Sequence, residues 1–404
     1  STTGRSRIFS YHRPLASSES GSLATRRDFQ LDSVLHSAYD IVPLPLTTRK
    51  QLMAPTKRMR HISTTAYKVL DAPDLEDNFY LNLMDWSNKD VLAVVLGKSI
   101  YVYDVEQGKV QKLLSFGELE SSGLYPSSVR WIEDGNVLAV GNRRGDLTTY
   151  DVQTGLKLRT ISGHTKRIGN ISSMDSLIAT GSADCTILLR DLRTPMPVKR
   201  ITAHLAEVCG LKFSTFGDPV LASGGDDCRL YVWDLRSSAT NSTSKQVSQT
   251  TIHRGRLSTS MAAKANSPTP LLSLTEHRAA VKGLAWSPHA RGLLASGGGK
   301  QDPIIRFWNT TMGYKIDQVQ CQSQVTNLAW SITSDELVST HGYGAATVPG
   351  VVTVWHYPTR TSNISFIAHS GRVLYLATSP HGQTIATASC DESLRFFEIF
   401  PPKQ

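Results

Sequence analysis

Residues 68–87 read KVLDAPDLEDNFYLNLMDWS and mark a change in the character of the chain. Before this stretch the sequence is basic, carries Ser, Thr and Pro, and has no sustained hydrophobic periodicity. After it, short apolar runs alternate with Gly, Asp and Asn, a pattern typical of β-strands joined by turns. The stretch therefore marks the entry to a repeat domain, and its acidic cluster is a candidate half of a binding site: Asp71, Asp74, Glu76 and Asp77.

Three sequence markers recur after residue 82 with a period of about 40–47 residues. One is a His that opens a repeat, and another is an inner strand that ends in Trp. The third is a dipeptide at the end of a strand: Tyr103-Asp104, Tyr150-Asp151, Arg190-Asp191, Trp233-Asp234, Trp308-Asn309, Trp355-His356 and Phe397-Glu398. Together the markers resemble the WD repeat, which forms one four-stranded blade. The seven dipeptides therefore predict an all-β fold, a seven-bladed WD-repeat β-propeller.

The ring of blades must close, because a single blade leaves both faces of its sheet uncovered. The stretch before Asn82 is placed to supply a closing strand to the last blade, which ends near Ile399. We therefore expect the propeller at residues 64–400. A basic, largely disordered tail with short docking motifs precedes it at 1–63, and a C-terminal tail follows at 401–404.

An insertion separates the fourth and fifth repeats, whose dipeptides are 75 residues apart. The excess lies in residues 237–270, where nine of the sixteen residues 237–252 are Ser or Thr. We expect a disordered loop here. Ser267 and Thr269 each precede a Pro and are candidate phosphorylation sites.

The positive charge of the chain is concentrated in its N-terminal part. The net charge is +9, and residues 1–67 hold ten Lys and Arg against four acids, or +6. Such a tail contacts nucleic acid, an acidic partner or an import receptor, or is simply solvated. No run of 18 apolar residues is present, so we expect no membrane-spanning helix. The five cysteines are scattered without a CxxC motif, which favours a reducing compartment and predicts neither disulfides nor a metal site.

Histidine and aspartate recur together at matching repeat positions: His164 with Asp184, His204 with Asp227, His277 with Asp302 and His369 with Asp391. Catalytic groups need not recur in each blade, whereas structural hydrogen bonds do, so we interpret these pairs as locks within the blades. The sequence contains no GxSxG, Walker, HExxH or helix-opening GxGxxG motif. We therefore expect no catalytic residue, no metal and no cofactor, in a protein that is not an enzyme.

Several phrases are more specific than a generic WD repeat: Lys68–Pro73, Phe79–Leu83, Asp85–Ser87, Glu207–Lys212, Ala280–Lys282, Ala285–Pro288, Ala295–Gly299, Ile305–Asn309, Ser323–Val325, Ser339–Tyr343 and Asp391–Arg395. Together they resemble the Fizzy/Fizzy-related family, the substrate-recruiting coactivators of the anaphase-promoting complex. The resemblance covers about Arg49 to Phe400. Its tail segment, Arg49–Ser63, looks more like the Fizzy-related branch than the Fizzy branch.

The resemblance implies a degron receptor for a multi-subunit E3 ubiquitin ligase that directs the degradation of cell-cycle proteins. In the family, a destruction-box peptide, Arg-x-x-Leu, lies on the side of the propeller between the first and last blades. Carried over by motif, Leu70, Asp71 and Glu392 fall at this site. The degron Arg needs carboxylates for charge-assisted hydrogen bonds, and its Leu needs an apolar pocket.

A second site of the family reads Lys-Glu-Asn boxes on the top face, and here the match is incomplete. Arg372 fits the family pattern as the cation that meets the acidic or amide groups of the box. Asp226 replaces an Asn, and Lys300 stands where Thr or Ser is usual. The extra carboxylate would repel the Glu of the box, while the lysine would attract it.

The tail contains an apolar and basic island, and such islands commonly dock on a partner and order there. We expect it to dock on the ligase through Arg49, Lys50, Leu52 and Pro55. Two family features are not found, namely the activating box Asp-Arg-Phe/Tyr-Ile-Pro-x-Arg and a C-terminal Ile-Arg. Because Arg5–Tyr11 resembles the segment that follows this box, we expect the box upstream of Ser1 and a chain truncated at both ends. The alternative is a divergent member of the family that couples to the ligase differently.

The expected partners are subunits of the anaphase-promoting complex, degron-bearing substrates such as cyclin- and securin-like proteins, and checkpoint or pseudosubstrate inhibitors, in the nucleus and cytoplasm. No membrane or nucleic-acid partner is expected. The alternative is a generic WD-repeat scaffold of an RNA-processing or signalling complex. Asp71, Glu392 and Arg372 at matched positions favour the receptor, whereas strong salt-dependent RNA binding by the tail would favour the scaffold.

Overall fold

The computed structural model describes residues within one compact unit, Arg60–Gln404. The described residues are 60, 62–116, 124–132, 135–194, 197–236, 269–344 and 350–402. Ser267 and most of the insertion lie outside these residues. The tail island, with Arg49, Lys50, Leu52 and Pro55, also lies outside them. The boundaries of the tail and of the insertion therefore stay predictions.

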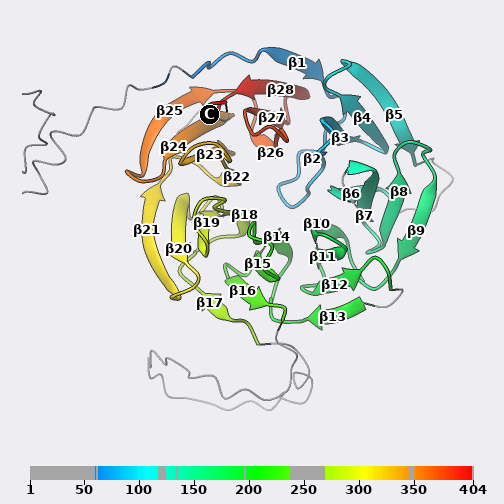
Figure 1. Cartoon of the computed structure of the whole chain (residues 1–404), viewed down its shortest axis with the longest axis horizontal. Coiled ribbons are helices and arrows are strands. Elements are labelled where there is room, and N and C mark those ends of the chain that lie inside the picture. The colour runs from blue at the N-terminus through cyan, green and yellow to red at the C-terminus, as the bar shows by residue number, and fades with distance from the viewer. Residues whose placement is uncertain are drawn as a thin grey trace, which may run out of the picture. The chain divides into compact units, whose positions relative to one another are not determined.

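In the described residues, 28 strands form seven four-stranded antiparallel sheets, which surround a central axis as blades (Figure 1). Blades 1 to 4 comprise β2 (Met84–Trp86), β3 (Val91–Leu96), β4 (Ser99–Asp104) and β5 (Lys109–Ser115); β6 (Pro126–Ile132), β7 (Val137–Asn142), β8 (Leu147–Asp151) and β9 (Lys157–Ile161); β10 (Ile168–Met174), β11 (Leu177–Ser182), β12 (Ile187–Asp191) and β13 (Pro197–Ile201); and β14 (Val208–Phe213), β15 (Val220–Gly225), β16 (Leu230–Asp234) and β17 (Leu272–Leu274). Blades 5 to 7 comprise β18 (Val281–Trp286), β19 (Leu293–Gly298), β20 (Ile304–Asn309) and β21 (Tyr314–Gln320); β22 (Val325–Trp330), β23 (Glu336–His341), β24 (Val351–His356) and β25 (Thr361–Ile367); and β26 (Val373–Thr378), β27 (Thr384–Ser389) and β28 (Ser393–Glu398) with β1 (Lys68–Asp71). The predicted seven-bladed propeller is confirmed.

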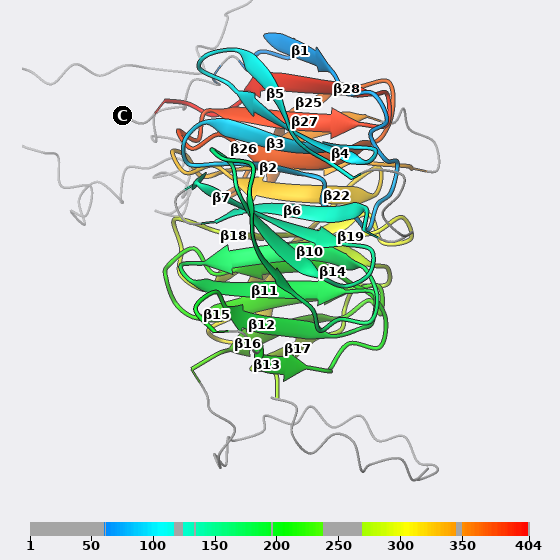
Figure 2. The same ribbon diagram turned by 90° about the vertical axis from the view of Figure 1, so that its right-hand side faces the viewer.

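The outermost strands of the blades are more exposed than the strands nearer the axis, and Figure 2 shows the sheets stacked in side view. The second strands β7 (VLAVGN) and β19 (LLASGG) are buried at every position, because neighbouring blades cover both of their faces. The outermost strands β5 and β9 are mostly exposed. The core therefore forms between blades. No helix of the described residues has the length and hydrophobicity to cross a membrane.

The ring closes through pairing of the first described strand with the last, as predicted. β1 runs antiparallel to β28, in a register that places Lys68 opposite Phe396 and Asp71 opposite Ser393. Phe396 is fully buried and packs against the rings of Tyr67 and Trp86. Blade 7 is thus assembled from two segments that are more than 300 residues apart in the sequence.

Hydrogen bonds among buried side chains lock four of the blades internally. In blade 4, the Nδ1 atom of His204 lies 3.1 Å from Asp227 Oδ1, and its Nε2 lies 2.9 Å from Ser223 Oγ. Blade 4 also adds a hydrogen bond from Trp233 Nε1 to Ser223 Oγ. The same His–Asp–hydroxyl arrangement recurs in blades 3, 5 and 7: His164–Asp184–Thr180, His277–Asp302–Ser296 and His369–Asp391–Thr387. The four predicted pairs are therefore present as structural locks.

Candidate functional site

A cleft of about 840 Å³ lies between the closing strand β1 and the first blade. Leu70–Asp74 lines one side, and residues of β3, β4 and β5 line the other, with Leu394 of β28 also contributing. In Figures 1 and 2, β1 lies next to β5 at the rim of the ring. The cleft therefore lies on the side of the propeller, at the junction of the first and last blades.

Local backbone chemistry shapes the near side of this cleft. β1 ends at Asp71, and the Ala72 N–H donates to the Glu392 carbonyl oxygen at 2.7 Å. Pro73 has no N–H and cannot continue the ladder. The Asp74 carbonyl oxygen then accepts from Gly97 N at 2.9 Å, which ties the segment to the turn between β3 and β4. The chain is thus fixed to both blades that border the cleft.

The lining of the cleft has an apolar part and an acidic part. The apolar part is made by residues with buried or half-buried side chains: Leu70, Leu92, Val94, Leu96, Tyr103, Phe116 and Leu394. The acidic part comprises Asp71 and Asp74, whose side chains are exposed. Within the described residues, the Asp71 carboxylate has no hydrogen-bond or ion-pair partner. An apolar wall beside exposed carboxylates suits a peptide that carries a cationic and an aliphatic side chain in close succession.

Glu392 lies beside this cleft, at the turn between β27 and β28. Its backbone has a left-handed conformation with φ of 57°, and its side chain is exposed. Its carbonyl oxygen holds Ala72, the residue after Asp71. The structure therefore brings together the three residues that the family resemblance places at one site, Leu70, Asp71 and Glu392, although Glu392 is at the border and does not line the cleft.

On another part of the surface, the segment Asp77–Tyr80 contacts two of the three residues predicted for the second site. Arg372 donates from Nε to Asp77 Oδ1 and from Nη2 to the Asp77 carbonyl oxygen at 2.9 Å. Tyr80 donates its hydroxyl to Asp226 Oδ1 at 2.9 Å. Lys300 is exposed, and within the described residues it forms no hydrogen bond or ion pair with Asp226 or Arg372.

Sequence reasoning missed these contacts of the acidic cluster. Glu76 pairs with Arg143 and Asp77 with Arg372, so these two carboxylates are already occupied, unlike that of Asp71. The guanidinium of Arg372 also lies 4.7 Å from the centre of the Tyr343 ring. Because Asp77 and Arg372 are 295 positions apart, no local pattern indicates the pair.

Neither a metal centre nor a disulfide is found in the described residues. No three His, Cys, Asp or Glu side chains there are arranged to hold a metal ion. The five cysteines are free, and burial raises the pKa of the Cys321 thiol to about 12, which disfavours its thiolate. The cleft itself presents carboxylates beside apolar side chains, which suit recognition by charge and apolar contact.

The comparisons with known proteins agree with the propeller fold. The family model described as CDC20/Fizzy WD40 domain matches residues 70–397. Protein FIZZY-RELATED 2 of Arabidopsis thaliana is 43% identical over 348 residues, which cover 86% of this chain and 64% of the relative. Anaphase-promoting complex subunit cdh1 of Dictyostelium discoideum is 43% identical over 369 residues, which cover 90% of this chain and 48% of the relative.

A solved structure is also similar. A chain in a crystal structure of the mitotic checkpoint complex superposes with a TM-score of 0.73 at 37% sequence identity, covering 86% of this chain and 95% of that chain. The present chain spans less than two thirds of the length of the two relatives named above. With the match of the family model over residues 70–397, the chain belongs to the CDC20/Fizzy family of WD40 proteins.

Proposed function

We propose that this chain is a substrate-recruiting coactivator of the anaphase-promoting complex, which binds destruction-box peptides in the cleft between β1 and blade 1. Family membership supports the proposal, and so does the name of the Dictyostelium relative, a subunit of that complex. The observation that carries it is the unpaired Asp71 carboxylate beside the apolar wall of the cleft. The role is recognition without catalysis, since the recurring His–Asp pairs serve as structural locks.

In the proposed complex, the degron Arg donates to the carboxylates of Asp71 and Glu392, and the degron Leu packs beside Leu70. Charge-assisted hydrogen bonds of this kind contribute about 1.5–3 kcal/mol each. Proposed partners beyond the ligase are cyclin- and securin-like substrates and checkpoint or pseudosubstrate inhibitors, in the nucleus and cytoplasm. The checkpoint-complex structure supports the inhibitor class, because a chain of that assembly has the same fold.

The test is fluorescence-anisotropy titration of a labelled destruction-box peptide with the full chain. A peptide with the Arg and Leu replaced by Ala serves as the ligand control. Asp71→Asn and Glu392→Gln remove charge with little change in shape, and each is expected to weaken binding by about 10- to 100-fold. Asp175→Asn, at an exposed turn of blade 3, is the matched control and should bind like the wild type.

Two results would contradict the proposal. One is equal binding of the intact and the Ala-substituted peptides. The other is an affinity that Asp71→Asn and Glu392→Gln leave unchanged, which would assign the peptide to another surface. Tight RNA binding that weakens steeply with salt, in the absence of peptide binding, would instead support the scaffold alternative.

The surface formed by Asp226, Lys300 and Arg372 remains the proposed site for Lys-Glu-Asn boxes. Because Asp77 already pairs with Arg372, the Glu of such a box would compete with an internal carboxylate. We therefore expect Asp77→Asn to bind a Lys-Glu-Asn peptide more tightly than the wild type does. An unchanged or lower affinity in the same anisotropy assay would remove Arg372 from this role.

A further inference from the structure

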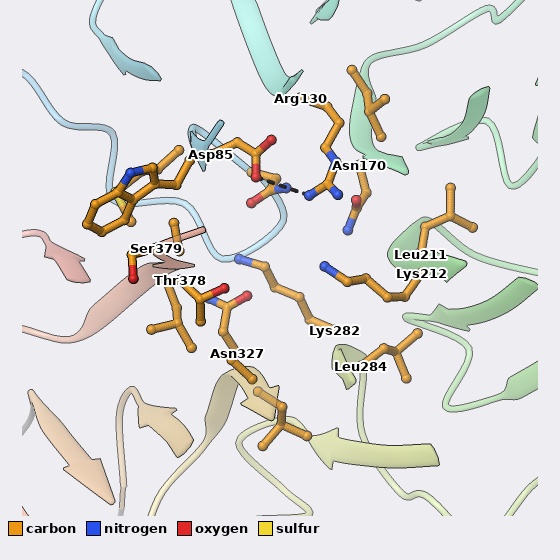
Figure 3. A pocket seen from close by; sticks show the side chains of 18 of the residues that line it. Asp85, Arg130, Asn170, Leu211, Lys212, Lys282, Leu284, Asn327, Thr378 and Ser379 are labelled. Carbon is orange, nitrogen blue, oxygen red and sulfur yellow. Dashed lines mark hydrogen bonds and ion pairs between the residues drawn. The ribbon is translucent and has the colours of Figure 1, made fainter. Parts of the chain in front are cut away.

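A second cavity, of about 280 Å³, runs along the axis of the propeller. It is lined by residues of the innermost strand of each of the seven blades, namely β2, β6, β10, β14, β18, β22 and β26. Figure 3 shows this channel from close by, with Lys212 and Lys282 directed toward its middle. Because all seven blades contribute to the lining, the channel brings together side chains from blades that are not neighbours in the ring.

The charged residues that line the described part of the channel are three cations and one carboxylate: Arg130, Lys212, Lys282 and Asp85. The carboxylate is already engaged on both oxygens. Asp85 Oδ1 accepts from Arg130 Nη1 at 3.0 Å, and Asp85 Oδ2 accepts from Trp131 N at 2.8 Å. The dashed line in Figure 3 marks the Asp85–Arg130 pair. The channel consequently has an excess of positive charge that no lining carboxylate balances.

Lys282 is satisfied by the protein itself. Its Nζ donates to the carbonyl oxygens of Leu81 and Leu374 at 3.0 and 3.3 Å. It also lies 5.3 Å from the ring centres of both Phe79 and Tyr375. Burial nevertheless lowers the pKa of Lys282 to about 7, because desolvation disfavours the ammonium form. An anion nearby would restore the charged form.

The ammonium group of Lys212, in contrast, has no hydrogen-bond acceptor of this kind. Within the described residues, no acceptor forms a hydrogen bond with its Nζ, although its side chain is partly buried. Burial, together with the charge of Arg130, lowers the pKa of Lys212 to about 8. The Lys212 ammonium group is open to the channel and has no acceptor from the described residues there. An anion in the channel would therefore form a charge-assisted hydrogen bond with it directly.

We propose that the axial channel binds a small oxyanion, such as phosphate or a carboxylate, held by Lys212 with Arg130 and Lys282. The three cations come from blades 4, 2 and 5, so one anion would link three separate sheets through charge-assisted hydrogen bonds. Asn170 and Asn327 add polar groups to the lining. The proposal is independent of the cleft at β1, because the two cavities share no lining residue.

The test uses the full chain and inorganic phosphate as the probe. Thermal unfolding is followed while phosphate is increased at constant ionic strength, with sodium chloride as the balancing salt. A ligand that binds only the folded state raises the midpoint in a saturable manner. A parallel series with citrate distinguishes a carboxylate ligand from a phosphate ligand. Broadening of the ³¹P resonance of phosphate by the protein gives a second readout that does not depend on unfolding.

Lys212→Met removes the charge and keeps the length of the side chain, and Lys157→Met is the matched control on the exposed strand β9. We expect the affinity for phosphate or citrate to fall at least about tenfold in Lys212→Met and to stay unchanged in Lys157→Met. Lys212→Arg should retain binding, because it keeps the positive charge. If Lys212→Met does not fold, Lys212→Gln takes its place in the same comparison.

The proposal is overturned by either of two outcomes. The first is that neither anion shifts the unfolding midpoint beyond the sodium chloride series and phosphate shows no broadening. The second is that Lys212→Met responds as the wild type does, which would place the anion elsewhere. Loss of destruction-box binding with anion binding intact would leave this inference unaffected, so the two proposals fail separately.

Discussion

Asp302 is the most buried carboxylate among the blade locks, and its removal is the sharpest test of how the blades are held. The residue is 3% exposed. It accepts from Arg306 at 2.6 and 3.1 Å and from Arg278 N at 3.1 Å, and its Oδ2 lies 2.7 Å from His277 Nδ1. Burial alone would raise its pKa, but the hydrogen bonds with His277 and Arg306 outweigh burial and hold the pKa below its usual range.

The loss of folding free energy depends on the buried charge that the substitution leaves unpaired. Asp302→Ala strands the guanidinium of Arg306, which is 5% exposed and whose Nε already has no partner within the described residues. Breaking a buried ion pair from one side costs about 3–5 kcal/mol of folding free energy. Asp227→Ala, at the same position of blade 4, removes the partner of His204 but strands no buried arginine, and should cost about 1–3 kcal/mol.

Urea unfolding at pH 7, followed by tryptophan fluorescence, measures both losses. We expect Asp302→Ala to lower the free energy of unfolding by about 2 kcal/mol more than Asp227→Ala does. The double variant Asp302→Ala/Arg306→Met should recover a large part of the loss, because it removes the stranded charge. Equal losses in the two single variants, or no recovery in the double variant, would refute the reasoning that the arginine sets the magnitude.

Three further changes test packing, titration and close approach. Ile62→Ala removes a buried side chain from the cluster around Phe397 and should lower the free energy of unfolding by about 2–5 kcal/mol; an unchanged thermal midpoint would show that this segment adds nothing to blade 7. Burial lowers the pKa of His369 from 6.5 to about 4, so the unfolded chain binds the proton more readily, and stability should fall by up to about 3 kcal/mol as the pH drops from 6.5 to 4. Denaturant unfolding at several pH values checks this, and in His369→Gln the dependence should be shallower. Gly224→Ala places a Cβ 2.2 Å from the Val281 carbonyl oxygen of the next blade. Gly217→Ala is the control: its Cβ has no neighbour within 4 Å, although its φ of +69° costs about 1–2 kcal/mol. In urea unfolding, Gly224→Ala should lower the free energy of unfolding more than Gly217→Ala does.

The repeat markers predicted the architecture well, because each marks a position that every blade must fill. A dipeptide such as Trp233-Asp234 ends a third strand wherever it occurs, and a His such as His204 meets its Asp in the same blade. These contacts are local to one repeat and follow from its period. The closing strand could be predicted as well, because the last blade lacks its fourth strand until another segment of the chain pairs with β28.

Contacts between distant blades could not be predicted in this way. The pairing of Asp77 with Arg372 and the meeting of Arg130, Lys212 and Lys282 in the channel depend on how the ring closes in three dimensions. The repeat period states which strand a residue belongs to, but not which side chain it faces across the axis. Leu70 and Asp71 were placed at the cleft through a family resemblance, and their binding role stays a prediction.

The pairing of β1 with β28 has a consequence for the order of events during synthesis. A nascent chain carries Asp71 from the start, but that residue has no sheet to join until Glu392 and β28 leave the ribosome, 321 residues later. At a translation rate of about 5–20 residues per second, the delay is roughly 15–65 s. The strands of blade 1 are synthesised long before then, so this side of the cleft exists before β1 is fixed in place on the other side. Until the ring closes, the cleft therefore lacks the side formed by Leu70–Asp74, and the proposed ligand has no complete cleft to enter.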